Sequence, residues 1–332
     1  MEKVIALVVT YNRQALLAEC ITALRNQSRP LDAILVVNNG STDATSKWLK
    51  KQSDIIIISQ QNLGSSGGFS AGIKWAFQNG YSWIWCMDDD GYPKEDALEK
   101  LMSADDGNLR LLNCAVIDRK DKKSFVWKTK HYKTLEEVDR PIIEGIGHPF
   151  NGTMLNRRIV ERVGLPQPKF FLWGDETEYY YRIVKRNNIP VCTVANSIHY
   201  HPSTAFSIKQ DWDYSNGWKM YYYVRNRFHI HKVKFNNKAI ALIHYSCFLM
   251  AFAMVVLLYQ KTDKIKKLGF ILWPVNDAFS NDFNATPNVI LNRLKTQNAF
   301  STTHFISNYL KNLILVLQAP FTPVRTRRAA NA

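Results

Sequence analysis

The sequence is poor in cysteine and lacks the spacing that marks zinc or disulfide proteins. Its 332 residues include five cysteines, widely spaced and without a Cys-x-x-Cys pair. This odd, unpaired set argues against a disulfide framework or a structural zinc site and favours a reducing compartment. Residues 1–3, followed directly by an apolar run, also lack a signal-peptide pattern. We therefore expect the fold to begin at the first residues.

Two common phosphate-binding motifs are also absent. The glycine-rich stretch at residues 62–72 has no Lys-Ser/Thr pair of a P-loop, and it does not match GxGxxG with a suitably spaced acidic residue. We interpret the stretch as a loop whose backbone approaches a nucleotide base or ribose. The alternative is a loop in which the glycines only supply unusual dihedral angles.

Acidic residues are in the minority. Lys and Arg number 43 against 28 Asp and Glu, which gives a net charge of +15. This charge favours a negatively charged partner, and nucleic acid, anionic lipid and a sugar nucleotide all qualify. The length and the 46% hydrophobic content predict one α/β domain with a sizeable core and an appended part.

Four apolar runs in the first hundred residues are each followed by a polar stretch, and helical patterns lie between them. The runs are residues 4–9, 33–37, 55–58 and 83–87. Repeated strand–loop–helix units predict a doubly wound parallel sheet, which binds ligands beyond the carboxyl ends of its strands. All four polar stretches fall at those ends. Residues 103–140 are expected to form loops and edge strands around residues 109–117.

Three carboxylates follow the fourth run directly. Side chains alternate along an extended chain, so Asp88 and Asp90 point one way and Asp89 the other. Two carboxylates on one side favour a cation between them, and oxygen ligands favour Mg²⁺ or Mn²⁺. A solvated acidic turn is the alternative for such a short motif. The convergence of the polar stretches on one sheet edge favours the metal site.

A second acidic group lies at residues 175–178. Asp175 and Glu178 have the spacing of a capping arrangement that opens a helix. Glu176 lies among aromatic residues that could raise its pKa toward that of a general base. The alternative for Glu176 is a solvated residue that supports the helix dipole. Farther along the chain, His199 and His201 point to the same side if their segment is extended. A neutral imidazole from one of them could complete the cation site of Asp88 and Asp90, which would favour Mn²⁺ as the ion.

The carboxyl-terminal third is basic and apolar. Residues 218–232 mix aromatic and basic side chains, as surfaces that bind single-stranded nucleic acid do. We favour an amphipathic helix that packs on the catalytic domain. A more specific alternative is that Arg225 and Arg227 contact phosphates of the donor or of a lipid-linked acceptor. Residues 239–259 carry no formal charge and are long enough to span a membrane, with lysines on both flanks. We favour a buried or interfacial helix there. The basic clusters at residues 261–267 and 325–328 suit an anionic cytoplasmic leaflet.

As a set, these motifs resemble the family-2 inverting glycosyltransferases of the GT-A fold over residues 3–230. The shared motifs, in chain order, are Thr10-Tyr11-Asn12, residues 38–43, Asn62-Leu63-Gly64 with Gly67-Gly68, Asp88-Asp89-Asp90 and residues 175–179. Within the family the chain looks most like bacterial galactofuranosyltransferases, with rhamnosyltransferases of O-antigen and capsule assembly close behind. The Trp-Gly-Asp-Glu-x-Glu-Tyr form at residues 173–179 favours galactofuranose.

The resemblance implies roles for particular residues. Asp175 and Glu176 take the places of the paired catalytic acids, of which the second is the usual base, although Asp is commoner there. Asp88, Asp90 and His201 would hold Mn²⁺ or Mg²⁺, with His199 as the alternative histidine. The implied nucleotide-sugar-binding set is Thr10, Tyr11, Asn12, Arg13, Asn39, Asn62, Gly64, Gly67, Gly68, Asp88, Asp89 and Trp173.

The resemblance also implies an activity and a location. It predicts a Rossmann-like GT-A domain at residues 1–230, with a mostly parallel sheet flanked by helices, and a helical, membrane-associating or oligomerising region at 231–332. The expected reaction moves galactofuranose from a UDP-sugar donor to a polyprenyl-diphosphate-linked glycan in cell-surface polysaccharide synthesis. A rhamnosyltransferase using dTDP-rhamnose is the near alternative. We expect a cytoplasmic protein peripherally associated with the anionic inner face of the plasma membrane, and leave a homo-oligomer open.

A nucleic-acid-binding protein is the alternative from another class. It would account for the net charge of +15 and the tyrosine-rich basic stretch. It gives no role to Asp88, Asp90 or Glu176, which would repel phosphates unless a metal were bound. We therefore expect no nucleic-acid partner.

Overall fold

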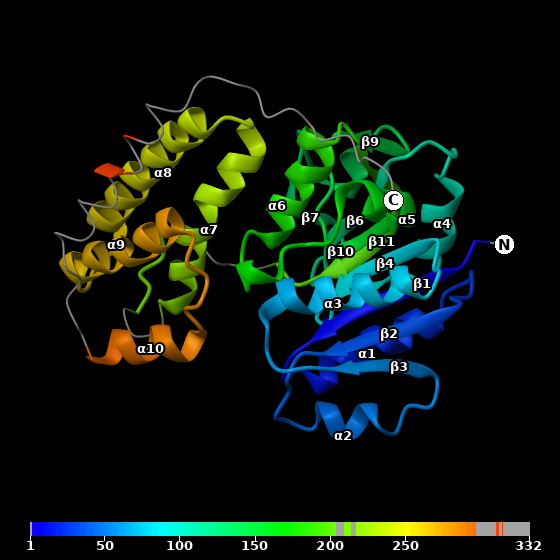
Figure 1. The fold of residues 1–332 in the computed structure, drawn as a ribbon. Helices are drawn as coiled ribbons and strands as arrows, with labels where there is room; N and C mark the ends of the chain where they lie inside the picture. The colour runs from blue at the N-terminus through cyan, green and yellow to red at the C-terminus, as the bar shows by residue number, and fades with distance from the viewer. Residues whose placement is uncertain (1, 204–208, 214–216, 297–309, 312–313, 315–332) are drawn as a thin grey trace, which may run out of the picture. The chain divides into compact units, whose positions relative to one another are not determined.

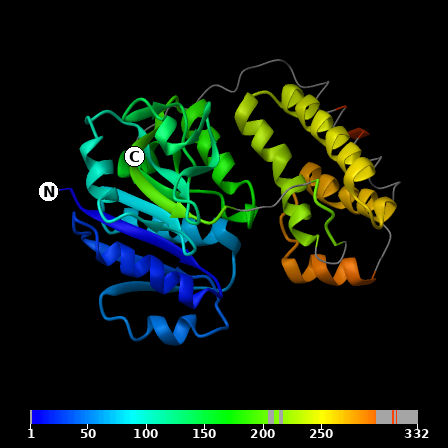
Figure 2. The same cartoon turned by 180° about the vertical axis from the view of Figure 1, so that it is seen from behind.

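The computed structural model describes residues 2–203, 209–213, 217–296, 310–311 and 314 (Figures 1 and 2). The chain divides into two compact units, one of residues 1–171 with 175–205 and one of residues 172–174 with 206–332. The predicted domain boundary after residue 230 lies inside helix α7, Trp218–Phe235. The compact units and the predicted domains therefore divide the chain at different points.

The first unit is a mixed sheet with helices on both faces. Its main strand order is β3–β2–β1–β4–β10–β6–β11–β5. The strands are β1 (Val4–Thr10), β2 (Ala33–Asn38), β3 (Ile55–Ser59), β4 (Trp83–Asp88), β5 (Tyr92–Pro93), β6 (Leu111–Asp118), β7 (Ser124–Thr129), β8 (Tyr132–Thr134), β9 (Ile142–Glu144), β10 (Asn151–Asn156) and β11 (Val191–His201). The four predicted runs form β1 to β4, and these pair in parallel as expected.

The helices of this unit follow the predicted alternation with strands. They are α1 (Gln14–Arg25), α2 (Thr45–Leu49), α3 (Gly64–Gln78), α4 (Ala97–Ser103), α5 (Arg157–Val163) and α6 (Asp175–Tyr181), with short helical turns at Leu135–Glu137, Pro168–Phe170 and Arg182–Arg186. Figure 1 shows α3 lying across the sheet strands. The prediction of an α/β fold with a parallel core and flanking helices is confirmed.

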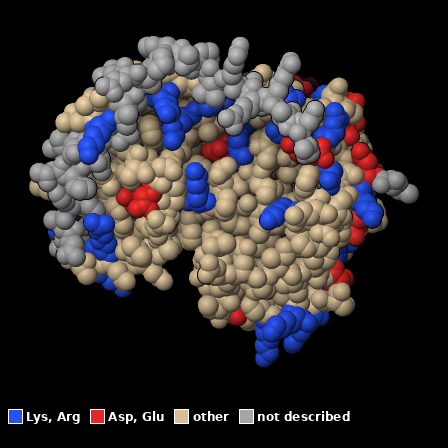
Figure 3. Space-filling model, viewed as in Figure 1, with Lys and Arg blue, Asp and Glu red and all other residues tan. Residues whose placement is uncertain are grey.

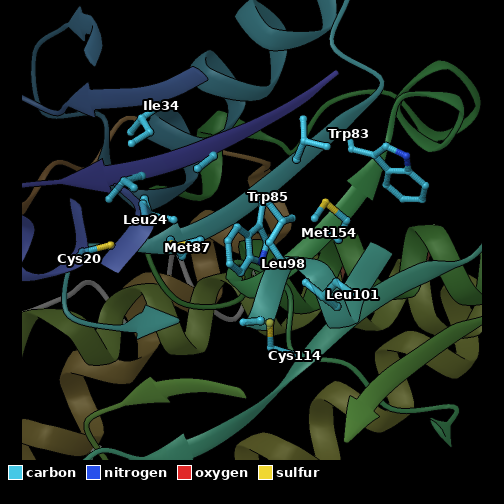
Figure 4. Close-up of a cluster of buried hydrophobic side chains, with 14 of the residues drawn as sticks. Cys20, Leu24, Ile34, Trp83, Trp85, Met87, Leu98, Leu101, Cys114 and Met154 are labelled. Carbon is cyan, nitrogen blue, oxygen red and sulfur yellow. The ribbon is translucent and has the colours of Figure 1, made fainter. Parts of the chain in front are cut away.

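The alternation of side chains along β1 explains why its whole sequence is apolar. Val4, Ala6 and Val8 belong to one buried cluster, which also holds residues of α1 and α4. The residues between them belong to the cluster on the other face, beneath α3 and α5. In Figure 4, Trp85 lies among side chains of the first cluster, close to Leu98. A parallel strand covered on both faces must be apolar at every position.

Two sequence-based expectations about this unit were wrong. Strand β6 was expected among edge strands and loops, but it lies between β10 and β11 in the interior of the sheet. Polar and charged residues flank this short apolar segment on both sides, so its burial depends on pairing with distant strands. The second error concerns residues 64–72, which were expected in a loop but belong to helix α3.

The glycines of α3 are explained by close packing on β1. A Cβ atom added to Gly68 would lie 2.4 Å from Cγ1 of Val9, and one added to Gly72 would lie 2.2 Å from Cδ1 of Leu7. Real Cβ atoms do not approach carbon so closely, so the helix and the strand would have to separate. Glycine here lets the helix pack closely against the sheet.

We therefore expect Gly68→Ala to destabilise the protein by about 1–3 kcal/mol, as overpacking does. The measurement is the urea midpoint of unfolding, with the m-value checked for constancy. Gly269→Ala is the matched control, because Gly269 lies inside a helix and its added Cβ would meet nothing within 4 Å. The control should be neutral or stabilising by about 0.5–1 kcal/mol. Equal midpoints for wild type and Gly68→Ala would contradict the packing explanation.

The second unit is helical. It contains α7, α8 (Lys238–Tyr259), α9 (Lys264–Ser280) and α10 (Pro287–Thr296). Arg225 of α7 is fully buried, and its guanidinium lies 4.9 Å from the ring centre of Tyr222 and 4.7 Å from that of Phe283. The suggestion that Arg225 meets phosphates was therefore wrong, and the favoured alternative of a packed helix holds for this residue.

Helix α8 is long and apolar enough to cross a membrane, by length and composition alone. One side of it, including Tyr245, Phe252 and Val256, is buried within the second unit. The opposite side exposes large apolar side chains, with Ile243 63% and Leu258 67% accessible. The expectation was a buried or interfacial helix, and this one-sided burial fits the interfacial alternative.

The basic cluster after α8 is only partly available to a partner. Lys267 is fully buried, and its ammonium group lies 2.8 Å from Asp211. Lys261 and Lys266 are exposed. The second predicted cluster, residues 325–328, lies outside the described residues.

Candidate active site

The acidic tip of β4 lies between two neighbouring strands that bring polar residues beside it. Asp88 is the last residue of β4 and lies opposite Val9 of β1. On the other side, Met87 lies opposite Asn151, the first residue of β10. Because β4 is a central strand, its carboxyl end receives side chains from both directions.

Asp89 is anchored by the turn that follows β1. The Thr10 hydroxyl donates a hydrogen bond to one carboxylate oxygen at 2.7 Å, and the Arg13 guanidinium donates to the other at 3.1 Å. Burial raises the pKa of Asp89, against the opposing effects of Thr10 and Arg13. These bonds fix the turn, and a contact of Asp89 with the donor stays a prediction.

Asp88, Asp90 and His201 form a group that could hold a metal ion. One ligand atom from each lies within 4.8 Å of the others. Burial alone would raise the pKa of Asp90, but hydrogen bonding and charge from His201 and Arg13 outweigh it and lower that pKa. Asp90 is therefore an anion at neutral pH, as a metal ligand must be.

The hydrogen bonding of His201 fits a metal ligand. Its Nδ1 lies 2.8 Å from the carbonyl oxygen of Pro202, which can only accept, so Nδ1 carries a proton. In the neutral ring, Nε2 then presents a lone pair, and it lies 3.3 Å from Oδ1 of Asp90. Two facing acceptors repel unless a cation or a proton lies between them. A backbone carbonyl that orients the imidazole is typical of metal-bound histidines.

His199, the alternative histidine, does not belong to this group. It is fully buried, and a Cβ added to Gly91 would lie 2.3 Å from its Nε2. Burial lowers the pKa of His199 to about 3. The group that could hold a metal contains His201 and not His199.

The paired acids at the start of α6 interact with the tip of β4. Burial raises the pKa of Asp175 well above its usual value, with further contributions from Glu176 and Asp88. Burial likewise raises the pKa of Asp88, and its carboxylate neighbours and Glu176 add to the effect. The acids of α6 and the tip of β4 therefore influence each other electrostatically.

Glu178 has a structural role as part of an ion pair. Both of its carboxylate oxygens accept hydrogen bonds from Arg182, at 3.0 and 2.9 Å. Arg182 in turn donates to the carbonyl oxygens of Val163 and Leu165. Glu178 therefore joins α6 to the segment after α5 through an ion pair. The helix start predicted at Asp175 is confirmed, and a capping role of Glu178 stays a prediction.

Several predicted nucleotide-binding residues hold the loops around the strand ends. Asn39 is buried, accepts a hydrogen bond from Gln60 at 2.8 Å and donates to the carbonyl of Gly64 at 2.8 Å. Asn62 accepts from the backbone of Gly64 at 2.9 Å. Asn12 accepts from the backbone of residue 42 at 2.7 Å. These side chains organise the edge, and their contact with a nucleotide stays a prediction.

The remaining members of that predicted set differ in exposure. Tyr11 is 44% accessible, and Gly67 lies buried within α3. Gly64 has a positive φ of +71°, and an added Cβ would lie 1.9 Å from the carbonyl oxygen of Phe171. Trp173 belongs to the second unit, where its ring lies 6.2 Å from that of Tyr223.

Three residues beside the acidic tip were missed as site candidates. They are Trp127, His148 and Asn151. The ring of Trp127 lies 5.0 Å from that of His201 and 5.2 Å from that of His148. The sequence interpretation of residues 147–154 considered only the glycines. The histidine and the asparagine in the same stretch were the available indication of a site.

Comparisons with known proteins agree on one family. The family model described as Glycosyl transferase family 2 matches residues 5–164. The galactofuranosyltransferase GlfT1 of Mycolicibacterium smegmatis is 32% identical over 216 residues, which cover 60% of this chain and 71% of that protein. GlfT1 of Mycobacterium tuberculosis is 29% identical over 215 residues, covering 60% and 70%. A structure of Staphylococcus aureus TarS 1–349 in complex with UDP superposes with a TM-score of 0.56 at 13% identity, covering 95% and 91% of the two chains.

Proposed function

Because the chain belongs to glycosyl transferase family 2 and has the GT-A fold, we propose that it is a metal-dependent inverting galactofuranosyltransferase. The donor would be UDP-galactofuranose, and the acceptor a polyprenyl-diphosphate-linked glycan of a cell-surface polysaccharide. The observation that carries the proposal is the group of Asp88, Asp90 and His201 next to the paired acids of α6. The names of the GlfT1 relatives support the donor sugar, and the UDP in the TarS complex supports the nucleotide.

Asp88, Asp90 and His201 would hold Mn²⁺ or Mg²⁺, because carboxylate oxygens with one imidazole suit these ions. When bound, such an ion neutralises the charge that builds up on a departing diphosphate. Arg13, which is paired with Asp89 and Asp90, adds a fixed positive charge at the same edge.

The paired acids divide the proton chemistry between them. Burial and the charge of Glu176 raise the pKa of Asp175, so Asp175 binds a proton more readily than an ordinary aspartate does. Glu176 is then the carboxylate that accepts the proton of the acceptor hydroxyl. The hydroxyl oxygen attacks the anomeric carbon from the face opposite the diphosphate, so the configuration inverts in a single displacement. Holding the two substrates in line supplies much of the rate.

The test is release of nucleoside diphosphate from a panel of sugar nucleotides, with Mn²⁺ and a lipid-linked acceptor. Transfer from UDP-galactofuranose is expected, and transfer only from dTDP-rhamnose would reject the proposed donor.

A gel shift with a salt titration tests nucleic-acid binding, for which we expect no specific complex. On the face shown in Figure 3, the described basic side chains lie in several separate groups.

The exposed side of α8 supports peripheral attachment to an anionic membrane. Apolar side chains face outward there, and Lys238, Lys261 and Lys266 are exposed at its two ends or just beyond. Apolar residues that enter the interface and lysines that meet anionic headgroups are the two components of such binding. Since a donor nucleotide is cytoplasmic, the inner face of the plasma membrane is the proposed location.

We expect the triple variant Ile243→Ser, Met250→Ser, Leu258→Ser to bind anionic vesicles at least about tenfold more weakly, because each lost side chain removes apolar burial. Co-sedimentation with phosphatidylglycerol-containing vesicles measures it. Val289→Ser, at a position 49% exposed on α10, is the matched control and should bind as wild type does. Unchanged vesicle binding with loss of a dimer in sedimentation velocity would instead identify α8 as an oligomer interface.

A further inference from the structure

A second cluster of polar and aromatic side chains lies beside the acidic tip and has no role in the chemistry above. It consists of Trp127, His148 and Asn151, here called the tryptophan wall. Asn151 opens β10 next to the end of β4, and Trp127 lies on β7, which pairs with β6. The ring of Trp127 contacts both His148 and the metal-site residue His201.

Two polar atoms of the wall are buried without a partner. Nε2 of His148 and Oδ1 of Asn151 have no hydrogen-bond partner among the described residues. A buried polar atom left in this state destabilises a protein, so native structures retain few of them. Two such atoms on one short segment beside an active site indicate groups that bond to a ligand.

The segment carrying these atoms is firmly held. The carbonyl oxygen of His148 accepts hydrogen bonds from the Thr153 hydroxyl at 3.1 Å and from the backbone of Asn151 at 3.2 Å. The single proton of the Thr153 hydroxyl is shared with Oδ1 of Asn113, at 2.6 Å. Phe150 between them adopts a φ of +70°, a region that non-glycine residues enter at an energetic cost. Strain held in place by such bonds is typical of segments pre-organised for binding.

The chemistry of the wall suits an uncharged ring rich in hydroxyl groups. Burial lowers the pKa of His148 to about 4, so its imidazole is neutral and can bond to a hydroxyl without attracting a phosphate. Asn151 is also neutral. An aromatic face with a few placed polar groups is the usual construction of a site for such a ligand.

The position of the wall in the sheet distinguishes the two sugars of the reaction. Most of the residues predicted to meet the nucleotide lie at or after the ends of β1, β2 and β3, on one side of β4. The wall belongs to β10 and to β7, which extends from β6, on the other side of β4. A donor that reaches the metal group from the first side leaves the second side to the acceptor.

We propose that Trp127, His148 and Asn151 form the subsite for the acceptor's sugar ring, with His148 and Asn151 bonding its hydroxyls and Trp127 packing on its face. The inference rests on the proposed function, since it names the acceptor side of the same site. The ligand class is a neutral glycoside.

The experiment compares wild type with His148→Phe, which keeps an aromatic ring but removes the bonding nitrogen. The acceptors are octyl glycosides of galactofuranose, rhamnose and N-acetylglucosamine, each tested with UDP-galactofuranose. The KM for the acceptor should rise about five- to tenfold, as expected for one lost hydrogen bond to a neutral partner, while the Kd for UDP changes less than about twofold. His148→Gln should recover part of the acceptor affinity. His131→Phe, at an exposed position, is the matched control.

Direct binding of the same glycosides, measured by saturation-transfer NMR without any donor, separates this inference from the proposed function. Wild type that binds a glycoside but releases no UDP would reject the donor assignment, while loss of binding in folded His148→Phe and Asn151→Leu would still support the wall. The inference is overturned if no glycoside binds wild type, if the acceptor KM is unchanged in both variants, or if the Kd for UDP rises in parallel with it.

Discussion

Replacing Glu176 with Gln should lower kcat by about 10²–10⁴-fold, the usual contribution of a general base, and leave the Kd for UDP nearly unchanged. Burial holds the pKa of its neighbour Asp175 well above the usual value, so Asp175 binds a proton more readily than an ordinary aspartate does. In the proposed mechanism, Glu176 is then the member of the pair that accepts the proton of the acceptor hydroxyl. Glutamine has the same shape but cannot accept a proton, so the chemical step fails while the donor still binds.

Asp175→Asn is the informative comparison. Asparagine resembles a protonated aspartate in shape and in its ability to donate a hydrogen bond, so this variant should retain more activity than Glu176→Gln. Glu161→Gln, at an exposed position where the carboxylate pairs with Arg157, serves as the control for loss of a carboxylate. Single-turnover rates and UDP titrations for the three variants decide the matter. An active Glu176→Gln with an inactive Asp175→Asn would reverse the roles of the two acids.

The core of the fold could be predicted because its strands are buried on both faces. Residues 4–9 and 83–87 form continuous apolar runs, and such runs followed by polar turns have few other solutions. The same reasoning failed at β6, where pairing with β10 and β11 decides burial, and local sequence does not encode distant partners. It failed again at α3, because glycine was read as a loop signal whereas here it permits close packing.

The candidate site was predictable only where it follows strand ends. The rule that ligands bind at the carboxyl ends of parallel strands brought Asp88 and Asp90 to the same edge as the predicted loops. Alternation put His199 and His201 on one face, so sequence could not choose between them. The choice depends on Gly91, whose turn packs against His199. Trp127 and His148 meet across separate segments, which no local pattern reveals.

The metal group gives the other large expected effect. Asp90→Asn should lower kcat/KM by about 10³-fold or more, because a weakly held cation no longer stabilises the charge on the leaving diphosphate. Asparagine keeps the volume of the side chain but removes its charge, so the ion pair of Asp90 with Arg13 is lost as well. The Mn²⁺ concentration for half-maximal activity should rise at least about tenfold. Asp54→Asn, which removes an exposed carboxylate paired with Arg25, is the matched control.

The metal requirement and the ligand assignment can be tested separately. Removal of divalent ions from the wild type by EDTA should abolish turnover, and Mn²⁺ should restore it. His201→Asn and Asp90→Asn should both weaken Mn²⁺ binding measured directly by electron paramagnetic resonance, whereas His131→Asn, at an exposed position, should not. Full activity in EDTA would remove the metal from the proposal altogether. Metal-dependent activity with unchanged Mn²⁺ affinity in both variants would instead mean that other residues hold the ion. The close approach of Asp90 to His201 would then be an ordinary ion pair between a carboxylate and a protonated imidazole.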